Sequence, residues 1–162
     1  GLPLKLVRPF NTYGPRQSAR AIIPTITAQL LNGKTEIELG NLSPTRDLTY
    51  VKDTCEGFEE IYKSDFFFGK VTNIGMKEEI SIGELAKLIA NILSIDLIIK
   101  STSERIRPKN SEVERLFCDN TKLIKHTAWK PKYSLERGIN EVVEWMKDPK
   151  NINYFKFDKY NV

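Results

Sequence analysis

The sequence predicts an α/β fold, in which short strands alternate with amphipathic helices. Apolar residues recur at helical spacing in several stretches, and short runs that are apolar or alternate apolar with polar lie between them. The chain has 162 residues, of which 40% are hydrophobic, and this is enough for one compact core. We therefore expect a single folded unit over residues 1–147 and a tail over residues 148–162.

The first strand is predicted by an apolar run, Leu4 to Val7, which we expect to be buried. It leads into a polar loop over residues 8–17 that holds an asparagine, a tyrosine, a Gly-Pro turn and two arginines. In α/β folds ligands lie at the carboxyl ends of strands. This loop is therefore a candidate for ligand contact.

The next elements follow from periodicity and capping signals. A helix is predicted with four apolar residues on one face and a glycine at its end: Ile22, Ile23, Ile26, Leu30 and Gly33. Residues 36–39 alternate as a strand, and residues 48–51 predict another. A second helix is expected to begin at the N-cap Asp53, with Glu56 three residues on, and to bury three apolar side chains: Phe58, Ile61 and Tyr62.

The C-terminal part continues the alternation. Residues 70–75 predict a strand and a turn, and residues 96–100 a further strand. Ser81 and Glu84 have the spacing of a capping box at the start of a helix. Ser134 is expected to open the last helix, which ends before Pro149 and turns four apolar residues inward: Ile139, Val142, Val143 and Met146.

Charge, cysteine content and hydropathy argue against several classes of protein. Lys and Arg exceed Asp and Glu by only 25 to 21, and the lysines are scattered, which favours a solvated basic surface over a nucleic-acid face. Cys55 and Cys118 are isolated and His126 is the one histidine, so we expect neither a metal site nor a disulfide framework, and a reducing cytoplasm as location. No apolar run approaches the ~20 residues that span a bilayer.

Several short motifs occur in an order that resembles extended short-chain dehydrogenase/reductases acting on nucleotide sugars, the NAD-dependent epimerase/dehydratase family. The matching motifs lie between about residues 4 and 147: Arg8-Pro9-Phe10-Asn11-Thr12-Tyr13-Gly14-Pro15, Ala21-Ile22-Ile23-Pro24, Leu39-Gly40, Arg46-Asp47, Tyr50-Val51-Lys52-Asp53, Asn73-Ile74-Gly75, Arg107-Pro108 and Trp129-Lys130-Pro131. The resemblance implies the substrate-binding part of a Rossmann-type fold, with its last strands and helices.

The motifs of that family's cofactor-binding and catalytic half are missing from the sequence. No Gly-x-x-Gly-x-x-Gly occurs, and neither Tyr50 nor Tyr62 has a lysine four residues later. The chain also begins at Gly1. We therefore interpret it as the C-terminal part of an enzyme whose N-terminal, NAD-binding half is absent, and we expect no catalytic residue in it. The resemblance implies NAD as the cofactor of the intact enzyme.

Two arginines are the foremost candidates for substrate binding. An arginine is permanently charged and donates in a bidentate fork to phosphate oxygens, and the family uses arginines at the positions of Arg46 and Arg107 for the diphosphate or the nucleoside. The alternative is a plain ion pair for each arginine, with these carboxylates as partners: Asp47 or Asp53, and Glu112 or Glu114.

The resemblance implies further contacts. For the substrate these are Asn11, Arg20, Ile37, Leu39 and Asn73. For the nicotinamide they are Pro9 and Phe10, through backbone and van der Waals contact. A turn-stabilising role remains open for Asn11 and Asn73, and a strand-core role for Ile37 and Leu39.

Two loops differ from those of many relatives. They are residues 41–45, Asn-Leu-Ser-Pro-Thr, and residues 109–116, after Arg107-Pro108. With residues 18–25, they look like the NAD-dependent 4,6-dehydratases that open legionaminic-acid-type sugar pathways and use UDP- or GDP-linked N-acetylglucosamine. The resemblance implies a homodimer of the intact enzyme, with no nucleic-acid or membrane partner.

Two other functions stay open. One is the same part of a nucleotide-sugar 4-epimerase. The other, of a different class, is a stand-alone nucleotide- or RNA-binding module, for which the tail offers aromatic and basic residues: Tyr154, Phe155, Lys156, Phe157, Lys159 and Tyr160.

Overall fold

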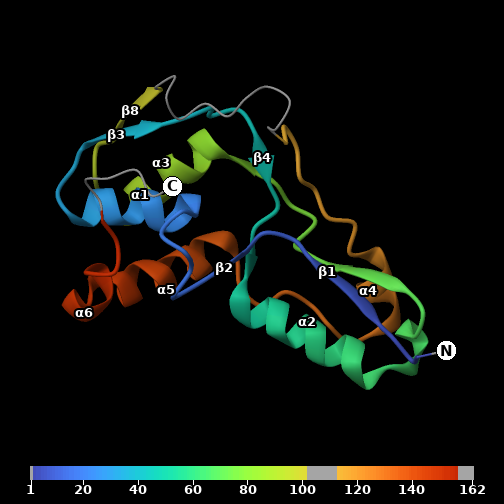
Figure 1. The fold of residues 1–162 in the computed structure, drawn as a ribbon. Helices are drawn as coiled ribbons and strands as arrows, with labels where there is room; N and C mark the ends of the chain where they lie inside the picture. The colour runs from blue at the N-terminus through green and yellow to red at the C-terminus, as the bar shows by residue number, and fades with distance from the viewer. Residues whose placement is uncertain (1, 102–112, 157–162) are drawn as a thin grey trace.

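The computed structural model describes residues 2–101 and 113–156, and it confirms the alternation of strands and helices (Figure 1). The elements in chain order are β1 (Leu6–Pro9), β2 (Thr12–Tyr13), α1 (Ile22–Leu31), β3 (Glu36–Leu39), β4 (Thr45–Arg46), β5 (Thr49–Tyr50), α2 (Val51–Lys63), η1 (Asp65–Phe67), β6 (Val71–Ile74), β7 (Ile80–Ser81), α3 (Ile82–Ile92), β8 (Ile98–Ser101), α4 (Thr121–His126), α5 (Leu135–Lys147) and α6 (Pro149–Ile152).

The strands of the described part form two-stranded sheets between segments far apart in the chain. β1 pairs with β6, β2 with β5 and β3 with β8, all parallel, whereas β4 and β7 are antiparallel. Parallel pairing needs a crossover connection, and helices supply it here. In β1·β6 the register places Leu6 opposite Val71 and Pro9 opposite Ile74, so the loop after β1 begins beside the turn after β6.

The main core lies between α1, α3 and α5, which Figure 1 shows grouped at the end of the molecule away from β1. α1 turns Ile23, Ile26 and Leu30 into it, as the periodicity predicted, and Gly33 follows α1 at φ 82°, a conformation that glycine adopts without cost. The capping box at Ser81 and Glu84 is confirmed. A second, smaller core lies under α2, β6 and α4.

The last helix begins as predicted, with the Ser134 side chain accepting from Arg137 N. Close packing ties it to the loop after β1, because a Cβ on Gly138 would lie 2.1 Å from Tyr13 Oη. Pro149 does not merely end this helix. It occupies the start of the short helix α6, where its missing N–H costs nothing. The chain then places Phe155 in the core, edge-on to Trp145.

The prediction for the second helix is wrong at its start and on its outer face. α2 begins at Val51 with Tyr50 as N-cap, and Asp53 lies in its first turn. The Asp53 carboxylate is buried and accepts from Lys132 N at 3.0 Å and Tyr133 N at 3.1 Å, so it serves a distant segment instead of capping its own helix. Ile61 is buried, but two other predicted core residues are exposed, Phe58 by 44% and Tyr62 by 80%.

The expected burial of the first strand is also wrong. Leu4 and Leu6 are 57% and 52% exposed. The physical reason is cover: Val7 packs against the second core, whereas Leu6, on the other face of β1, is turned to solvent. Among the described residues β1 is bonded to β6 alone, so its other edge is open as well. β1 and α2 lie at the same end of the molecule (Figure 1). Exposed apolar residues occur in β1, α2, η1 and the residues next to them: Leu2, Leu4, Leu6, Phe58, Tyr62, Phe66 and Phe68.

This exposed apolar end predicts self-association of the 162-residue chain. A parallel sheet is normally covered on both faces, and an open edge pairs readily with another chain. We expect a light-scattering mass above that of the monomer that grows with concentration. Leu6→Lys should lower it by placing a charge on the edge. A monomeric mass at all concentrations, together with cooperative unfolding, would count against this expectation.

Other features of the described residues are structural. His126 stacks on Phe66 with ring centroids 3.5 Å apart, and Trp129 is buried with Nε1 donating to Asp53 O at 2.9 Å. No cluster of three or more potential metal ligands occurs in the described ranges. None of their helices is long and apolar enough to cross a membrane.

Candidate functional site

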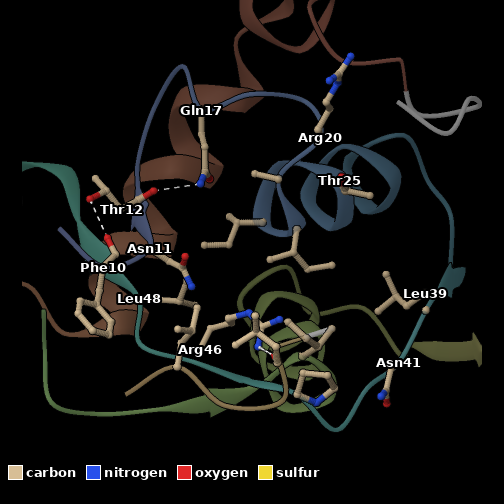
Figure 2. A pocket seen from close by; sticks show the side chains of 18 of the residues that line it. Phe10, Asn11, Thr12, Gln17, Arg20, Thr25, Leu39, Asn41, Arg46 and Leu48 are labelled. Atoms are coloured by element: carbon tan, nitrogen blue, oxygen red, sulfur yellow. Dashed lines mark hydrogen bonds between the residues drawn. The ribbon is translucent and has the colours of Figure 1, made fainter. Parts of the chain in front are cut away.

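A cavity of about 690 Å³ lies where the chain leaves β1, enters α1 and passes the ends of β3 and β4 (Figure 2). Six of the residues predicted for substrate or cofactor contact line it: Pro9, Phe10, Asn11, Arg20, Leu39 and Arg46. They come from separate segments of the chain. The fold therefore brings together residues that the sequence only suggested one by one.

The loop after β1 is held in place by hydrogen bonds. Phe10 N donates to Ile74 O at 2.8 Å, and Thr49 N donates to Asn11 O at 3.0 Å. Thr12 Oγ1 donates to Phe10 O at 3.1 Å. These bonds fix the backbone on both sides of Asn11, whose side chain lines the cavity.

Backbone oxygens anchor the Arg46 side chain to the cavity wall. Its Nη1 donates to Thr45 O at 2.8 Å and to Val113 O at 2.7 Å. Figure 2 shows the guanidinium of Arg46 and the amide of Asn11 on neighbouring parts of the wall, whereas Arg20 extends away from both. A fixed guanidinium suits an anionic group that presents two oxygens side by side, such as a phosphate or a carboxylate, since its N–H donors already point in set directions.

The carboxylates proposed as alternative partners of Arg46 are bound elsewhere. Asp47 is fully buried, and its oxygens accept from Met76 N at 2.8 Å, Lys77 N at 2.9 Å and Cys118 N at 3.1 Å. Burial raises the pKa of Asp47, while these backbone N–H bonds act in the opposite direction. Asp53 accepts from the 132–133 segment, as described above. Asp47 thus holds the base of β4, next to Arg46.

Three predicted residues are not part of the cavity lining described by the structure. Ile37 is buried in the main core, and Asn73 lies in β6 with its Nδ2 donating to Asp119 O at 3.2 Å. Arg107 lies outside the described residues. Sequence reasoning missed several lining residues, for which residue type alone gave no signal: Thr12, Gln17, Thr25, Asn41, Leu48 and Leu116.

An ion pair lies behind the Arg46 wall. Glu79 accepts from Arg115 Nη2 at 2.7 Å and from Thr45 Oγ1 at 2.6 Å. These two donors lower the pKa of Glu79 from 4.5 to about 2. The folded-state pKa lies below the unfolded value. The contribution of this pair to stability is therefore present above the unfolded pKa and is lost as the pH falls toward 2.

The Glu79 carboxyl is expected to titrate near pH 2 in the folded chain. The measurement is its carboxyl ¹³C chemical shift by NMR between pH 6 and pH 2. Arg115→Ala should move the midpoint upward, toward the ordinary range of a glutamate, because the main donor is gone. A midpoint already in the ordinary range in the unaltered chain would contradict the ion pair.

The fold and the cavity define a Rossmann-like α/β chain with a ligand-sized site at strand ends. The family model of GDP-mannose 4,6 dehydratase matches residues 1–142, so the chain belongs to that family. This confirms the resemblance to nucleotide-sugar epimerases and dehydratases.

Individual relatives agree. The chain is 31% identical over 156 residues to a UDP-N-acetyl-alpha-D-glucosaminuronate decarboxylase of Bacillus cytotoxicus, covering 93% of this chain and 48% of that one. It is 28% identical over 151 residues to a putative UDP-glucose 4-epimerase of Methanocaldococcus jannaschii, covering 91% of this chain and 47% of that one. The chain thus spans about half the length of the curated relatives it matches.

Solved structures of nucleotide-sugar dehydratases and epimerases also match the fold of this chain. A dTDP-glucose 4,6-dehydratase of Bacillus anthracis, in complex with NAD, matches with a TM-score of 0.75 at 28% identity, covering 92% of this chain and 45% of that one. A UDP-glucuronic acid 4-epimerase of Bacillus cereus, in complex with UDP-glucuronic acid and NAD, matches with a TM-score of 0.79 at 26% identity. The match covers 90% of this chain and 46% of that one.

Proposed function

We propose that this chain is the substrate-binding part of an NAD-dependent nucleotide-sugar 4,6-dehydratase that acts on UDP- or GDP-linked N-acetylglucosamine. The observation that carries the proposal is the anchored guanidinium of Arg46 in a cavity of about 690 Å³ that Asn11 also lines. Cavities of roughly 300–1,000 Å³ hold small-molecule ligands and cofactors. Membership of the family supports a nucleotide sugar as that ligand.

The cavity lining has the chemistry that such a ligand needs. A diphosphate carries negative charge and is best met by arginine in a site partly shielded from water. Asn11 offers amide hydrogens for a phosphate or sugar oxygen. Leu39, Leu48 and Ile22 add apolar wall for the flat face of a base or the hexose ring. The chain would thus bind the diphosphate and orient the hexose toward the nicotinamide.

Pro9 and Phe10 lie at the edge of the same cavity, where they suit van der Waals contact with a nicotinamide ring. The sequence lacks the glycine-rich fingerprint, so NAD would be held mainly by residues outside these 162. When bound, the cofactor supplies oxidation at the sugar C4 hydroxyl and return of hydride to C6 after water is lost across C5 and C6. The contribution of this chain is proximity and orientation.

These 162 residues alone are expected to show no turnover. The sequence contains no Tyr-x-x-x-Lys, and the family resemblance implies that the acid and base for water loss also lie outside these residues. We propose that the intact enzyme works in the cytoplasm as a homodimer, with the nucleotide sugar as its partner and neither nucleic acid nor membrane.

A 4-epimerase is the second candidate, favoured by the relatives and the solved structure of that name. The two activities share the first oxidation and diverge at the acidic pair required for water loss. An RNA-binding module has less support in the described part of the tail. Phe155 is buried there against Trp145 and offers no exposed stacking face, which leaves Tyr154, at 76% exposed, as the accessible aromatic side chain of the described tail residues.

Isothermal titration of the chain with UDP-N-acetylglucosamine and with GDP-N-acetylglucosamine tests the proposal. We expect saturable heat with one of the two, which would also show which base is read. Arg137→Ala, an arginine on α5 outside the cavity lining, is the control and should bind equally well. Absence of binding by a folded chain, and by the longer protein that carries the NAD-binding half, would contradict the proposal.

A further inference from the structure

Part of the cavity wall is a short strap, Val113–Leu116, that lies beside β4. Thr45 N donates to Glu114 O at 2.9 Å, and Leu116 N donates to Thr45 O at 3.1 Å, which makes an isolated parallel bridge. Val113 and Leu116 line the cavity. The position of the strap therefore sets the shape of this wall, although an isolated bridge attaches it only weakly.

Glu79 provides a second attachment. Its carboxylate accepts from Arg115 Nη2 at 2.7 Å and from Arg115 Nε at 2.9 Å, and it accepts from Thr45 Oγ1 at 2.6 Å. Glu79 therefore joins the strap to β4 at the same place as the backbone bridge. The Glu79 and Arg115 side chains are 27% and 63% exposed, so their pair adds little to global stability. Because both Nε and Nη2 of Arg115 donate to the carboxylate, the pair instead fixes the orientation of Arg115, and with it the strap, relative to β4.

The strap in turn holds the arginine of the candidate site. Arg46 Nη1 donates to Thr45 O in β4 at 2.8 Å and to Val113 O in the strap at 2.7 Å, so one of its two anchors depends on where the strap lies. A free arginine side chain loses rotamer freedom when it is fixed. Since the strap fixes it beforehand, a ligand that binds Arg46 meets less of that cost.

We propose that Glu79 is a positioning residue of the nucleotide-diphosphate site. It fastens the strap to β4 and thereby holds the Arg46 guanidinium at the cavity wall, without contact to the ligand. This inference rests on the proposed function, because it takes Arg46 as the group that binds the diphosphate. It adds a residue that lies outside the lining of the main cavity and that the sequence motifs did not indicate.

Amide hydrogen exchange tests the fastening without any ligand. Glu79→Gln keeps the size of the side chain and removes its charge. We expect exchange at Leu116 N and Thr45 N to accelerate about tenfold, since residues in one hydrogen-bond network are energetically coupled. Glu36→Gln is the matched control, because it breaks an exposed ion pair of the same 2.7 Å length, with Lys100. Unchanged exchange at the strap in Glu79→Gln would overturn the proposal.

Titration with UDP and GDP as probes tests the action through Arg46. Glu79→Gln should weaken binding about fivefold in the unaltered chain and not at all in an Arg46→Ala background. An equal loss in both backgrounds would mean that Glu79 acts by another route, and the proposal would be wrong. If Arg46→Ala weakens binding and Glu79→Gln does not, this inference alone fails. If neither the unaltered chain nor the longer protein that carries the NAD-binding half binds either probe, the proposed function fails and the positioning role with it.

Discussion

Replacing Arg46 by alanine is expected to weaken binding of a nucleoside diphosphate about 30-fold. A hydrogen bond to a charged group contributes roughly 1.5–3 kcal/mol, and 2 kcal/mol corresponds to that factor. We expect a loss of affinity and not of folding. The guanidinium lies at the cavity wall, and water can donate to the two backbone oxygens that it leaves. Isothermal titration with UDP or GDP measures it.

Two further variants make this result specific. Arg46→Lys should recover only part of the affinity, since an ammonium group cannot donate in a fork. Asn11→Ala should cost less than Arg46→Ala, because it removes a neutral donor. Equal affinities of Arg46→Ala and the unaltered chain would remove Arg46 from the site.

Replacing Asp47 by alanine is expected to lower the free energy of unfolding by about 4 kcal/mol. The fully buried carboxylate accepts from three backbone N–H groups, of Met76, Lys77 and Cys118. Leaving buried donors unsatisfied costs roughly 1–3 kcal/mol each. Lys77 adopts φ 61° in this turn, a strained conformation for a residue with a side chain, which the hydrogen bonds help to maintain.

Urea unfolding followed by tryptophan fluorescence measures this loss. Asp96→Ala is the control, because Asp96 is exposed on the segment before β8 and its removal should change the unfolding free energy by less than about 0.5 kcal/mol. A loss below about 1 kcal/mol in Asp47→Ala would mean that the three amides find other partners.

The parts of the fold that local sequence determines were predicted well. α1 and α3 follow from periodicity together with a terminating glycine or a capping box, all within one stretch of chain. Asp53 was misinterpreted because the groups that it binds lie 79 and 80 residues away, on Lys132 and Tyr133. Leu4 and Leu6 were expected to be buried because their composition is that of an inner strand, but burial depends on what covers the strand.

The candidate site shows the same limit. The polar loop after β1 was predicted from its place after a strand, and Arg46 from the family resemblance and the chemistry of arginine; both line the cavity. Ile37 and Leu39 share one face of β3, yet only Leu39, at the carboxyl end, reaches the cavity. The hydrogen bond from Arg46 to Val113 O joins residues 67 apart in the sequence, so no local sequence pattern predicts it.

The central claim is that the cavity between β1, α1 and β4 holds the diphosphate of a nucleotide sugar. Mapping of NMR chemical-shift changes on titration with UDP and GDP tests it most directly. The account predicts that the largest changes fall on Asn11, Arg46 and Leu39, with the outer face of α2 unaffected. Changes centred instead on the exposed apolar end around Tyr62 and Phe68, with none at Asn11 and Arg46, would contradict it.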